Sequence, residues 1–222
     1  MNTLLELLKK SNYQTFDIFG NTFVGASDSN KKFEMSRLSE EDINLKRILD
    51  IGCNAGYFLF RLSEKNPLLL HGIDVSEKYI EIAKELNREF YKKDCCIFTC
   101  CDFNLTNINE KYDYIICFST FHYFADAQEN FFDRIFNTIA DNGYAFIEIE
   151  EFPENTKPFV KKSVRDQEKK ENLFLHYPNR SKVEEWCTSK FQIEDRYPSV
   201  YQSGSLYPRY FYKLRKIRPR QE

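Results

Sequence analysis

Between Arg47 and Glu150, short apolar runs alternate with segments whose apolar residues recur at helical spacing. Buried strands of a parallel sheet need nearly continuous apolar sequences, and the crossovers between them need helices. The alternation therefore predicts an α/β fold in which helices cover a mostly parallel sheet. The expected strands lie in "RILDIG", "LLLHGIDV", "CCIFTCCDF", "YDYIICFS" and "YAFIEIE".

Two connecting segments have the pattern of amphipathic helices. "SEKYIEIAKELNREFYKKD" begins with Ser76 as a predicted N-cap, and "DAQENFFDRIFNTIADNG" ends in Asn142-Gly143, which favours a left-handed helix stop. Both segments place apolar residues on one face, so we expect both to pack on the sheet. These residues are Tyr79, Ile82, Ala83, Leu86 and Phe90 in the first, and Phe132, Ile135, Phe136 and Ile139 in the second.

The flanks of this region differ in composition. Residues 152–190 contain three prolines and many charges, which predicts a lid or substrate insertion of helices and loops. A short helix, "SKVEEWCTSK", and two strand-like runs, "FQIEDRYPSVY" and "RYFYKLRK", follow, and the runs are expected to pair as antiparallel strands. A chain of 222 residues is short for two independent domains, so residues 47–222 are expected to form one domain with residues 1–46 as a helical flank.

Charge and cysteine content restrict the surroundings of the chain. The net charge of −2 provides no general attraction to nucleic acid, apart from the short basic stretch "KLRKIRPRQE". Seven cysteines and no long apolar N-terminal run predict a cytoplasmic protein without membrane contact. Four of the cysteines lie in one strand-like run, so small buried residues are expected there rather than zinc ligands, and no metal site is predicted. They are Cys95, Cys96, Cys100 and Cys101.

The stretch "ILDIGCNAGYF" combines the end of a predicted strand with a glycine-bearing turn. The dinucleotide pattern G-x-G-x-x-G starting at Gly52 would need glycine at positions 54 and 57, where the chain has Asn54 and Tyr57. A nicotinamide dinucleotide is therefore not the expected ligand.

The stretch Asp50-Ile51-Gly52-Cys53-Asn54-Ala55-Gly56 resembles motif I of class I S-adenosylmethionine-dependent methyltransferases. Asn54 replaces the middle glycine of that motif, and asparagine tolerates left-handed backbone angles better than other non-glycine residues. The resemblance implies a Rossmann-like fold with a mostly parallel seven-stranded sheet, helices on both faces and an antiparallel last strand. It also implies that Asp50, Gly52, Cys53, Asn54 and Gly56 bind S-adenosylmethionine.

The next strand ends extend the resemblance. Asp74 with Val75 follows the second strand, where a carboxylate can accept the ribose hydroxyls, and Asp102 with Phe103 follows the third, where the family contacts adenine. The run "CFSTFHYF" follows the fourth strand, so Phe118 and Ser119 are expected to line the cofactor sulfur. The N-terminal flank would then close over the cofactor.

Two residues are candidates for contact with the methyl acceptor. His122 could remove a proton from a hydroxyl or an amine, or could be a packing residue. Glu148 and Glu150 lie on one face of the fifth strand, and either Glu148 contacts substrate or both form a solvated pair. His71 is expected to be structural, and His176 to lie on a surface loop.

The nature of the acceptor is left open by the sequence. The acidic balance favours transfer to an oxygen or nitrogen of a small molecule or sugar. The glycine turn, the strand end "FIEIEEF" and the basic tail distantly resemble RNA 5′-phosphate methyltransferases. The segment "FDIFGNTFVGASDSNKKFEMSRL" with the turn that follows it is similar to bacterial small-molecule and glycan methyltransferases, and also to an enzyme of tRNA wobble-uridine modification. RNA is therefore the alternative acceptor. A catalytically silent cofactor-binding module is the third possibility.

Overall fold

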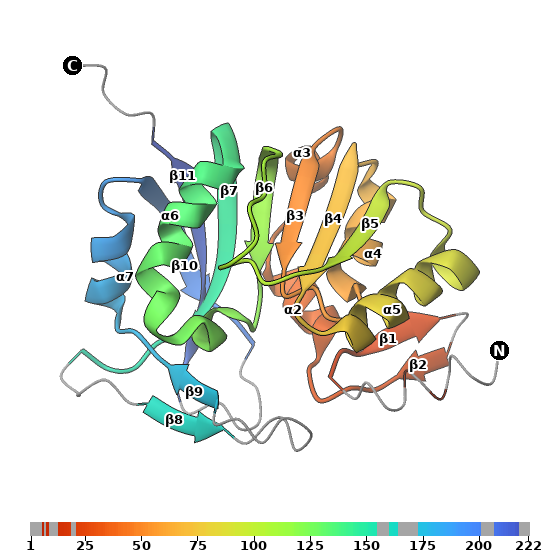
Figure 1. Cartoon of the computed structure of the whole chain (residues 1–222), viewed down its shortest axis with the longest axis horizontal. Coiled ribbons are helices and arrows are strands. Elements are labelled where there is room, and N and C mark those ends of the chain that lie inside the picture. Colours follow the sequence, from red (N-terminus) through yellow and green to blue (C-terminus); the bar gives the residue numbers. More distant parts are fainter. Residues whose placement is uncertain are drawn as a thin grey trace.

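A seven-stranded sheet forms the centre of the protein (Figure 1). The computed structural model describes residues 6, 8, 13–18, 21–154, 160–163, 173–200 and 207–217, with the backbone alone at 21, 125–126, 160–163 and 173–176. The strand order is β10-β11-β7-β6-β3-β4-β5. The strands are β3 (Arg47–Ile51), β4 (Leu69–Asp74), β5 (Cys96–Cys100), β6 (Tyr112–Cys117), β7 (Ile139–Glu150), β10 (Phe191–Pro198) and β11 (Arg209–Lys216).

Strand directions confirm the predicted Rossmann-like architecture. Strands β3 to β7 of this sheet pair in parallel, whereas β11 pairs antiparallel with β7 and β10 antiparallel with β11. All five predicted parallel strands and both predicted C-terminal strands are present. The antiparallel pair follows from the short hairpin-like connection between the last two strands, since a parallel pair would need a longer crossover.

Helices cover both faces of the sheet. One face packs against α4 (Tyr57–Leu62) and α5 (Glu77–Leu86), and the other against α6 (Gln128–Thr138) and α7 (Arg180–Cys187). In β3, Ile48 belongs to the first core cluster and Leu49 to the second, because successive side chains of a strand point to opposite faces. Short helical turns complete the chain at η1 (Ser63–Lys65), η2 (Asn87–Tyr91) and η3 (Phe121–Ala127).

One helix end differs from the prediction. Helix α6 ends at Thr138, and β7 begins at Ile139, which has an extended backbone (ψ 142°). Asn142 does have a left-handed backbone (φ 64°), but it lies within β7, where Tyr112 pairs with Ile139 and Tyr114 with Tyr144. The predicted helix stop is therefore a bulge in the strand.

The N-terminal flank is not purely helical. It contains α2 (Ser29–Met35) and α3 (Glu40–Ile43), but also the antiparallel strands β1 (Phe16–Ile18) and β2 (Asn21–Phe23). Phe16 and Ile18 are buried on either side of exposed Asp17, which is the alternation of a half-buried strand. The extent of this flank as a separate unit stays a prediction.

The region predicted as a lid also contains strands. Its described part holds the antiparallel pair β8 (Val160–Ser163) and β9 (Leu173–His176), while residues 155–159 and 164–172 lie outside the described chain. In Figure 1 the pairs β1–β2 and β8–β9 both lie beyond the end of the sheet at which the arrow of β3 points. None of the described helices is long and apolar enough to cross a membrane.

Candidate cofactor and acceptor site

The candidate site lies at the carboxyl ends of β3 and β6, where the strand order reverses. The chain leaves β3 toward β4 on one side of the sheet and later returns to β6 on the other side. Open α/β sheets bind ligands in the crevice formed at such a reversal. The predicted cofactor residues all belong to strand ends or turns around this point.

The turn after β3 is built from left-handed backbone. Gly52, Asn54 and Gly56 have φ angles of 77°, 52° and 86°, so the predicted tolerance of Asn54 for this conformation is confirmed. The N–H groups of Gly52 and Cys53 donate to the carbonyl of Ile73 at 2.8 and 3.0 Å, which ties the turn to β4. A Cβ on Gly52 would overlap the side chain of Thr120, so this position is sterically restricted to glycine.

Asp74 joins the turn to the next strand end. Its two carboxylate oxygens accept from the N–H groups of Asn54 and Ser76, each at 2.9 Å. Burial raises its pKa, although these N–H groups oppose the shift. Each oxygen keeps a second lone pair, and adjacent Val75 is 69% exposed, so the pair offers two acceptors and an apolar surface.

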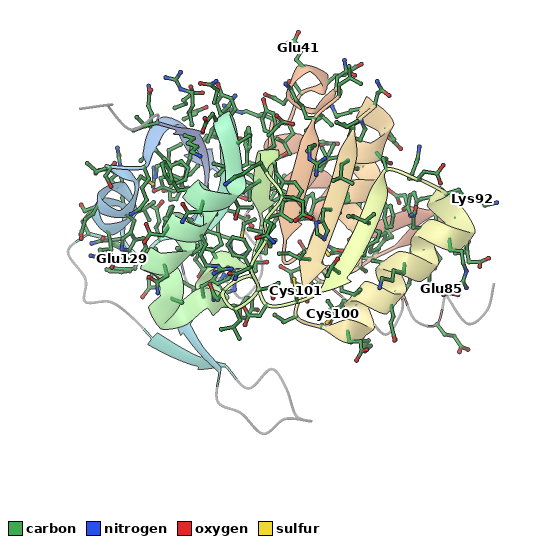
Figure 2. All side chains as sticks on the ribbon, turned by 45° about the horizontal axis from the view of Figure 1, so that its top comes forward. Glu41, Glu85, Lys92, Cys100, Cys101 and Glu129 are labelled. Carbon is green, nitrogen blue, oxygen red and sulfur yellow. The ribbon has the colours of Figure 1, made fainter. Side chains whose placement is uncertain are left out.

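The residues that follow β5 are less exposed to solvent than expected of residues that contact a ligand. Asp102 accepts from the N–H of Asn104 at 2.7 Å, but Phe103 is only 2% exposed and packs edge-on against Phe131. Figure 2 shows Cys100 and Cys101 at this end of β5, and Cys100 is exposed. Of the four cysteines expected to be buried, only Cys96 is. Cys95 and Cys101 lie beyond the ends of β5, and Cys100 is exposed at the end of this edge strand.

The residues present fit the cofactor that the resemblance implies. The left-handed turn and the carboxylate of Asp74 can hold its amino acid and ribose parts, and Val75 can pack against its base. Asp50, near the end of β3, has a buried carboxyl oxygen that no described residue satisfies. It is 2% exposed, and its Oδ2 has no hydrogen-bond partner among the described residues.

The end of β6 meets a buried network of charges that the sequence did not reveal. Glu148 is 2% exposed, and its Oε2 accepts from Lys32 Nζ, from the Ser119 N–H and from the Ser119 hydroxyl, each at 2.8 Å. Its Oε1 accepts from the hydroxyl of Ser199. Lys32, in α2, has a side chain only 1% exposed and also donates to Ser119 Oγ.

Arg209 adds a second cation to this network. It pairs with Glu150 at 3.0 Å, donates to Ser119 Oγ at 3.2 Å, and lies 3.9 Å from Glu148. Ser119 thus has two cations and one carboxylate around it, and its backbone is left-handed (φ 57°). These contacts hold Ser119, the residue expected to line the cofactor sulfur, in one position.

The ionisation of Glu148 follows from these contacts. Burial alone would raise its pKa, but the charges of Lys32 and Arg209 outweigh burial and lower the pKa to about 2. An acid of this strength is a poor proton acceptor at neutral pH. The pair is therefore buried rather than solvated, and Glu148 holds Ser119 and α2 in place. Contact between Glu148 and substrate stays a prediction.

Lys32 and Arg209 were missed for a structural reason. Lys32 lies beside exposed Lys31 in a polar stretch, and its partner Glu148 is 116 positions away. Arg209 interrupts the aromatic sequence "YPRYFY" at the first residue of β11. The arginine at the start of an apolar strand was the available signal, since a buried guanidinium needs a carboxylate partner.

His122 lies in η3, at the same edge of the sheet. It is 7% exposed, with the rings of Tyr123 and Tyr177 at centroid distances of 4.3 and 6.0 Å. Phe118 is also buried, between the rings of Phe58 and Phe211, both at 5.1 Å. The roles of these residues stay predictions.

The N-terminal flank contacts the cofactor turn directly. Gln14 is 6% exposed, donates to the Cys53 carbonyl at 3.3 Å and accepts from the Tyr57 N–H at 3.4 Å. Together with Lys32, it attaches the flank to the turn after β3 and to the residues at the end of β6. The closing role of the flank stays a prediction.

The structure describes the side chain of only one of the other two histidines. His71 bonds to Tyr112 at 2.6 Å and Thr99 at 2.9 Å across the sheet, as expected of a structural residue. His176 lies in β9, where the side chain is not described. Within the described part of the chain, no three His, Cys, Asp or Glu residues form a group that could hold a metal.

Comparison with known sequences gives one family and several relatives. A family described as "Methyltransferase domain" matches residues 44–206. The chain is 34% identical over 113 residues to a tRNA U34 carboxymethyltransferase from Sulfurimonas denitrificans, covering 50% of this chain and 37% of that protein. It is 26% identical over 159 residues to a protein of the same name from Campylobacter jejuni, covering 70% and 52%. The chain thus spans about half the length of these relatives or less.

Solved structures resemble the chain in fold. An S-adenosylmethionine-dependent methyltransferase from Listeria monocytogenes has a TM-score of 0.69 at 14% identity, over 86% of this chain and 100% of that chain. An N-methyltransferase from Bradyrhizobium japonicum in complex with S-adenosylhomocysteine has a TM-score of 0.63 at 16% identity, over 86% and 88%. At these identities the likeness concerns the fold.

Proposed function

This chain belongs to the S-adenosylmethionine-dependent methyltransferases, and from that premise we propose that it transfers a methyl or carboxymethyl group from a sulfonium cofactor to uridine 34 of tRNA. The alignment with the tRNA-modifying relatives, over as much as 70% of the chain, carries this proposal. It replaces the small-molecule acceptor favoured by the net charge. Charge over the whole chain is a weak guide here, because an RNA contact needs only a local basic surface.

The location of β8 and β9 is compatible with a large acceptor. This pair lies at the carboxyl edge of the sheet (Figure 1), and the sequence of β8 includes Lys161 and Lys162. Phosphate contacts by lysine contribute most of the sequence-independent affinity for RNA. We therefore place the expected RNA path along this edge.

The chemistry requires little of the protein beyond positioning. The bound sulfonium supplies an electrophilic carbon, and transfer is an in-line displacement that depends on alignment. The turn from Gly52 to Gly56 and Asp74 would bind the cofactor, and Ser119 would line its reacting end. His122 would take the proton if the accepting atom carries one.

The transferred group is methyl or carboxymethyl, and the buried cations bear on that choice. A carboxymethyl group carries a carboxylate, which needs cationic donors where it is shielded from water. Lys32 and Arg209 both contact Ser119 Oγ, and each has more N–H groups than the bonds described above use. This observation favours carboxymethyl as the variant of the proposed reaction, with a donor whose sulfonium carries a carboxymethyl group.

The test compares two donors and two RNAs. The full chain is incubated with unmodified tRNA or with the same tRNA carrying cytidine at position 34, and with S-adenosylmethionine or its carboxylated analogue. We expect a modified nucleoside only in the uridine-34 tRNA, with a mass that identifies the group. Equal modification of both tRNAs, or transfer to small hydroxyl or amine acceptors and not to tRNA, would contradict the proposal.

A further inference from the structure

Asp50 is a buried carboxyl group whose charge nothing in the described chain balances. It lies near the end of β3, between β4 and β6, and is 2% exposed. Its Oδ2 lacks any hydrogen-bond partner among the described residues, and no ion pair with Asp50 occurs there. An isolated ionised carboxylate at such a position is strongly unfavourable.

The titratable groups that interact electrostatically with Asp50 are acids and thiols. They are Asp74 from the end of β4, Cys117 from β6 and Cys53 from the turn. Burial first, and then the charge of Asp74, raise the pKa of Asp50 well above its usual range. The buried cations of the site, Lys32 and Arg209, pair with Glu148 and Glu150 instead.

The neutral acid is therefore the stable form of Asp50 while the site holds no cation. S-adenosylmethionine carries two positive groups, the sulfonium and the amino acid ammonium, and is expected to bind at the turn that directly follows Asp50. A cation placed near Oδ2 favours the ionised carboxylate. The balance between neutral and ionised Asp50 thus depends on what occupies the site.

We propose that Asp50 holds a proton in the ligand-free chain and loses it when a cationic cofactor binds, so that this residue selects cationic over neutral ligands. The O–H bond of the carboxyl breaks, the proton passes to the solvent, and the carboxylate remains with the ligand cation. This inference rests on the cofactor site of the proposed function and adds a proton to its binding equilibrium.

Calorimetry measures the released proton directly. S-adenosylmethionine is titrated into the full chain at pH 7 in two buffers with low and high ionisation enthalpy. We expect the binding enthalpies to differ by an amount that corresponds to about one proton per cofactor. Asp50→Asn, which has no proton to lose, should bind with the same enthalpy in both buffers.

A second measurement needs no variant and covers the case in which Asp50→Asn fails to fold. Release of one proton makes affinity rise about tenfold per pH unit, so wild-type affinity should fall about tenfold from pH 7 to pH 6. The ligand ammonium stays charged over this range. Affinity that is constant between these pH values would overturn the proposal.

Two further ligands identify the responsible cation. S-adenosylhomocysteine keeps the ammonium but lacks the sulfonium charge, and adenosine lacks both. Proton release with both cofactor forms assigns the ammonium, and release with S-adenosylmethionine alone assigns the sulfonium. Release with adenosine, or cofactor binding without release, would refute the role of Asp50 while leaving the cofactor site intact. Absence of any cofactor binding by the folded chain would overturn both.

Discussion

Removing the charge of Lys32 tests the buried network from which much of the site is built. In Lys32→Met, the apolar side chain leaves Glu148 at 2% exposure without its closest cation. Loss of one partner of a buried pair costs about 3–5 kcal/mol. Arg209 remains 3.9 Å from Glu148 and compensates partly, so we expect the lower end, about 3 kcal/mol.

The pKa of Glu148 gives a second route to this magnitude. Its fall from the ordinary 4.5 to about 2 corresponds to about 3 kcal/mol of folded-state stabilisation. Because the folded-state value is depressed, this contribution is complete above pH 4.5 and is lost as the pH falls toward 2. The two estimates agree in order of magnitude.

Urea unfolding at pH 7 provides the assay. A loss of about 3 kcal/mol should leave the chain folded without urea if its stability lies in the usual range of about 5–15 kcal/mol. The matched control is Lys31→Met, an exposed neighbour in α2, which should change the unfolding free energy by less than about 0.5 kcal/mol.

A double variant distinguishes the effect of leaving a buried charge unpaired from the effect of losing the packing of the Lys32 side chain. Lys32→Met combined with Glu148→Gln removes both charges and should recover much of the stability, because no unpaired ion stays buried. Its unfolding free energy should also lose the pH dependence that Glu148 contributes below pH 4.5. If Lys32→Met is as stable as Lys31→Met, the reasoning about the network is refuted.

Three further variants test the cofactor and acceptor parts of the site. Gly52→Ala should weaken S-adenosylmethionine binding at least tenfold, since the left-handed backbone at this position costs alanine about 1–2 kcal/mol and the added Cβ meets Thr120. Combining Gly52→Ala with Thr120→Gly should recover only the part of the loss that is due to this steric overlap. Wild-type affinity in Gly52→Ala would contradict the prediction. Asp74→Ala should lose about 1.5–3 kcal/mol of cofactor binding by calorimetry, because it removes acceptors for the ligand and for the Asn54 N–H, and unchanged affinity would exclude a ribose contact there. His122→Gln should lower kcat on tRNA about 10²–10⁴-fold with cofactor affinity unchanged if the imidazole takes a proton, whereas an unaltered pH profile would indicate a packing role.

The local sequence was sufficient to predict the parallel strands of the sheet and the left-handed turn after β3. Buried parallel strands are recognisable from continuous apolar runs such as "RILDIG", and a turn with left-handed backbone requires glycine or asparagine at Gly52, Asn54 and Gly56. Both signals depend on neighbours in the chain, so no knowledge of the fold was needed. The strand order then brings Asp74 to the turn, as expected for consecutive parallel strands.

The tertiary structure alone decided the charge environment of the site. Lys32, Ser119, Glu148 and Arg209 come from four separate parts of the chain, and no local pattern distinguishes a lysine that becomes buried from Lys31 beside it. The same holds for Asp50, whose unpaired oxygen follows from what β4 and β6 place next to it. Burial and pairing depend on contacts between residues distant in sequence, and these contacts determine which carboxyl group is ionised and which keeps its proton.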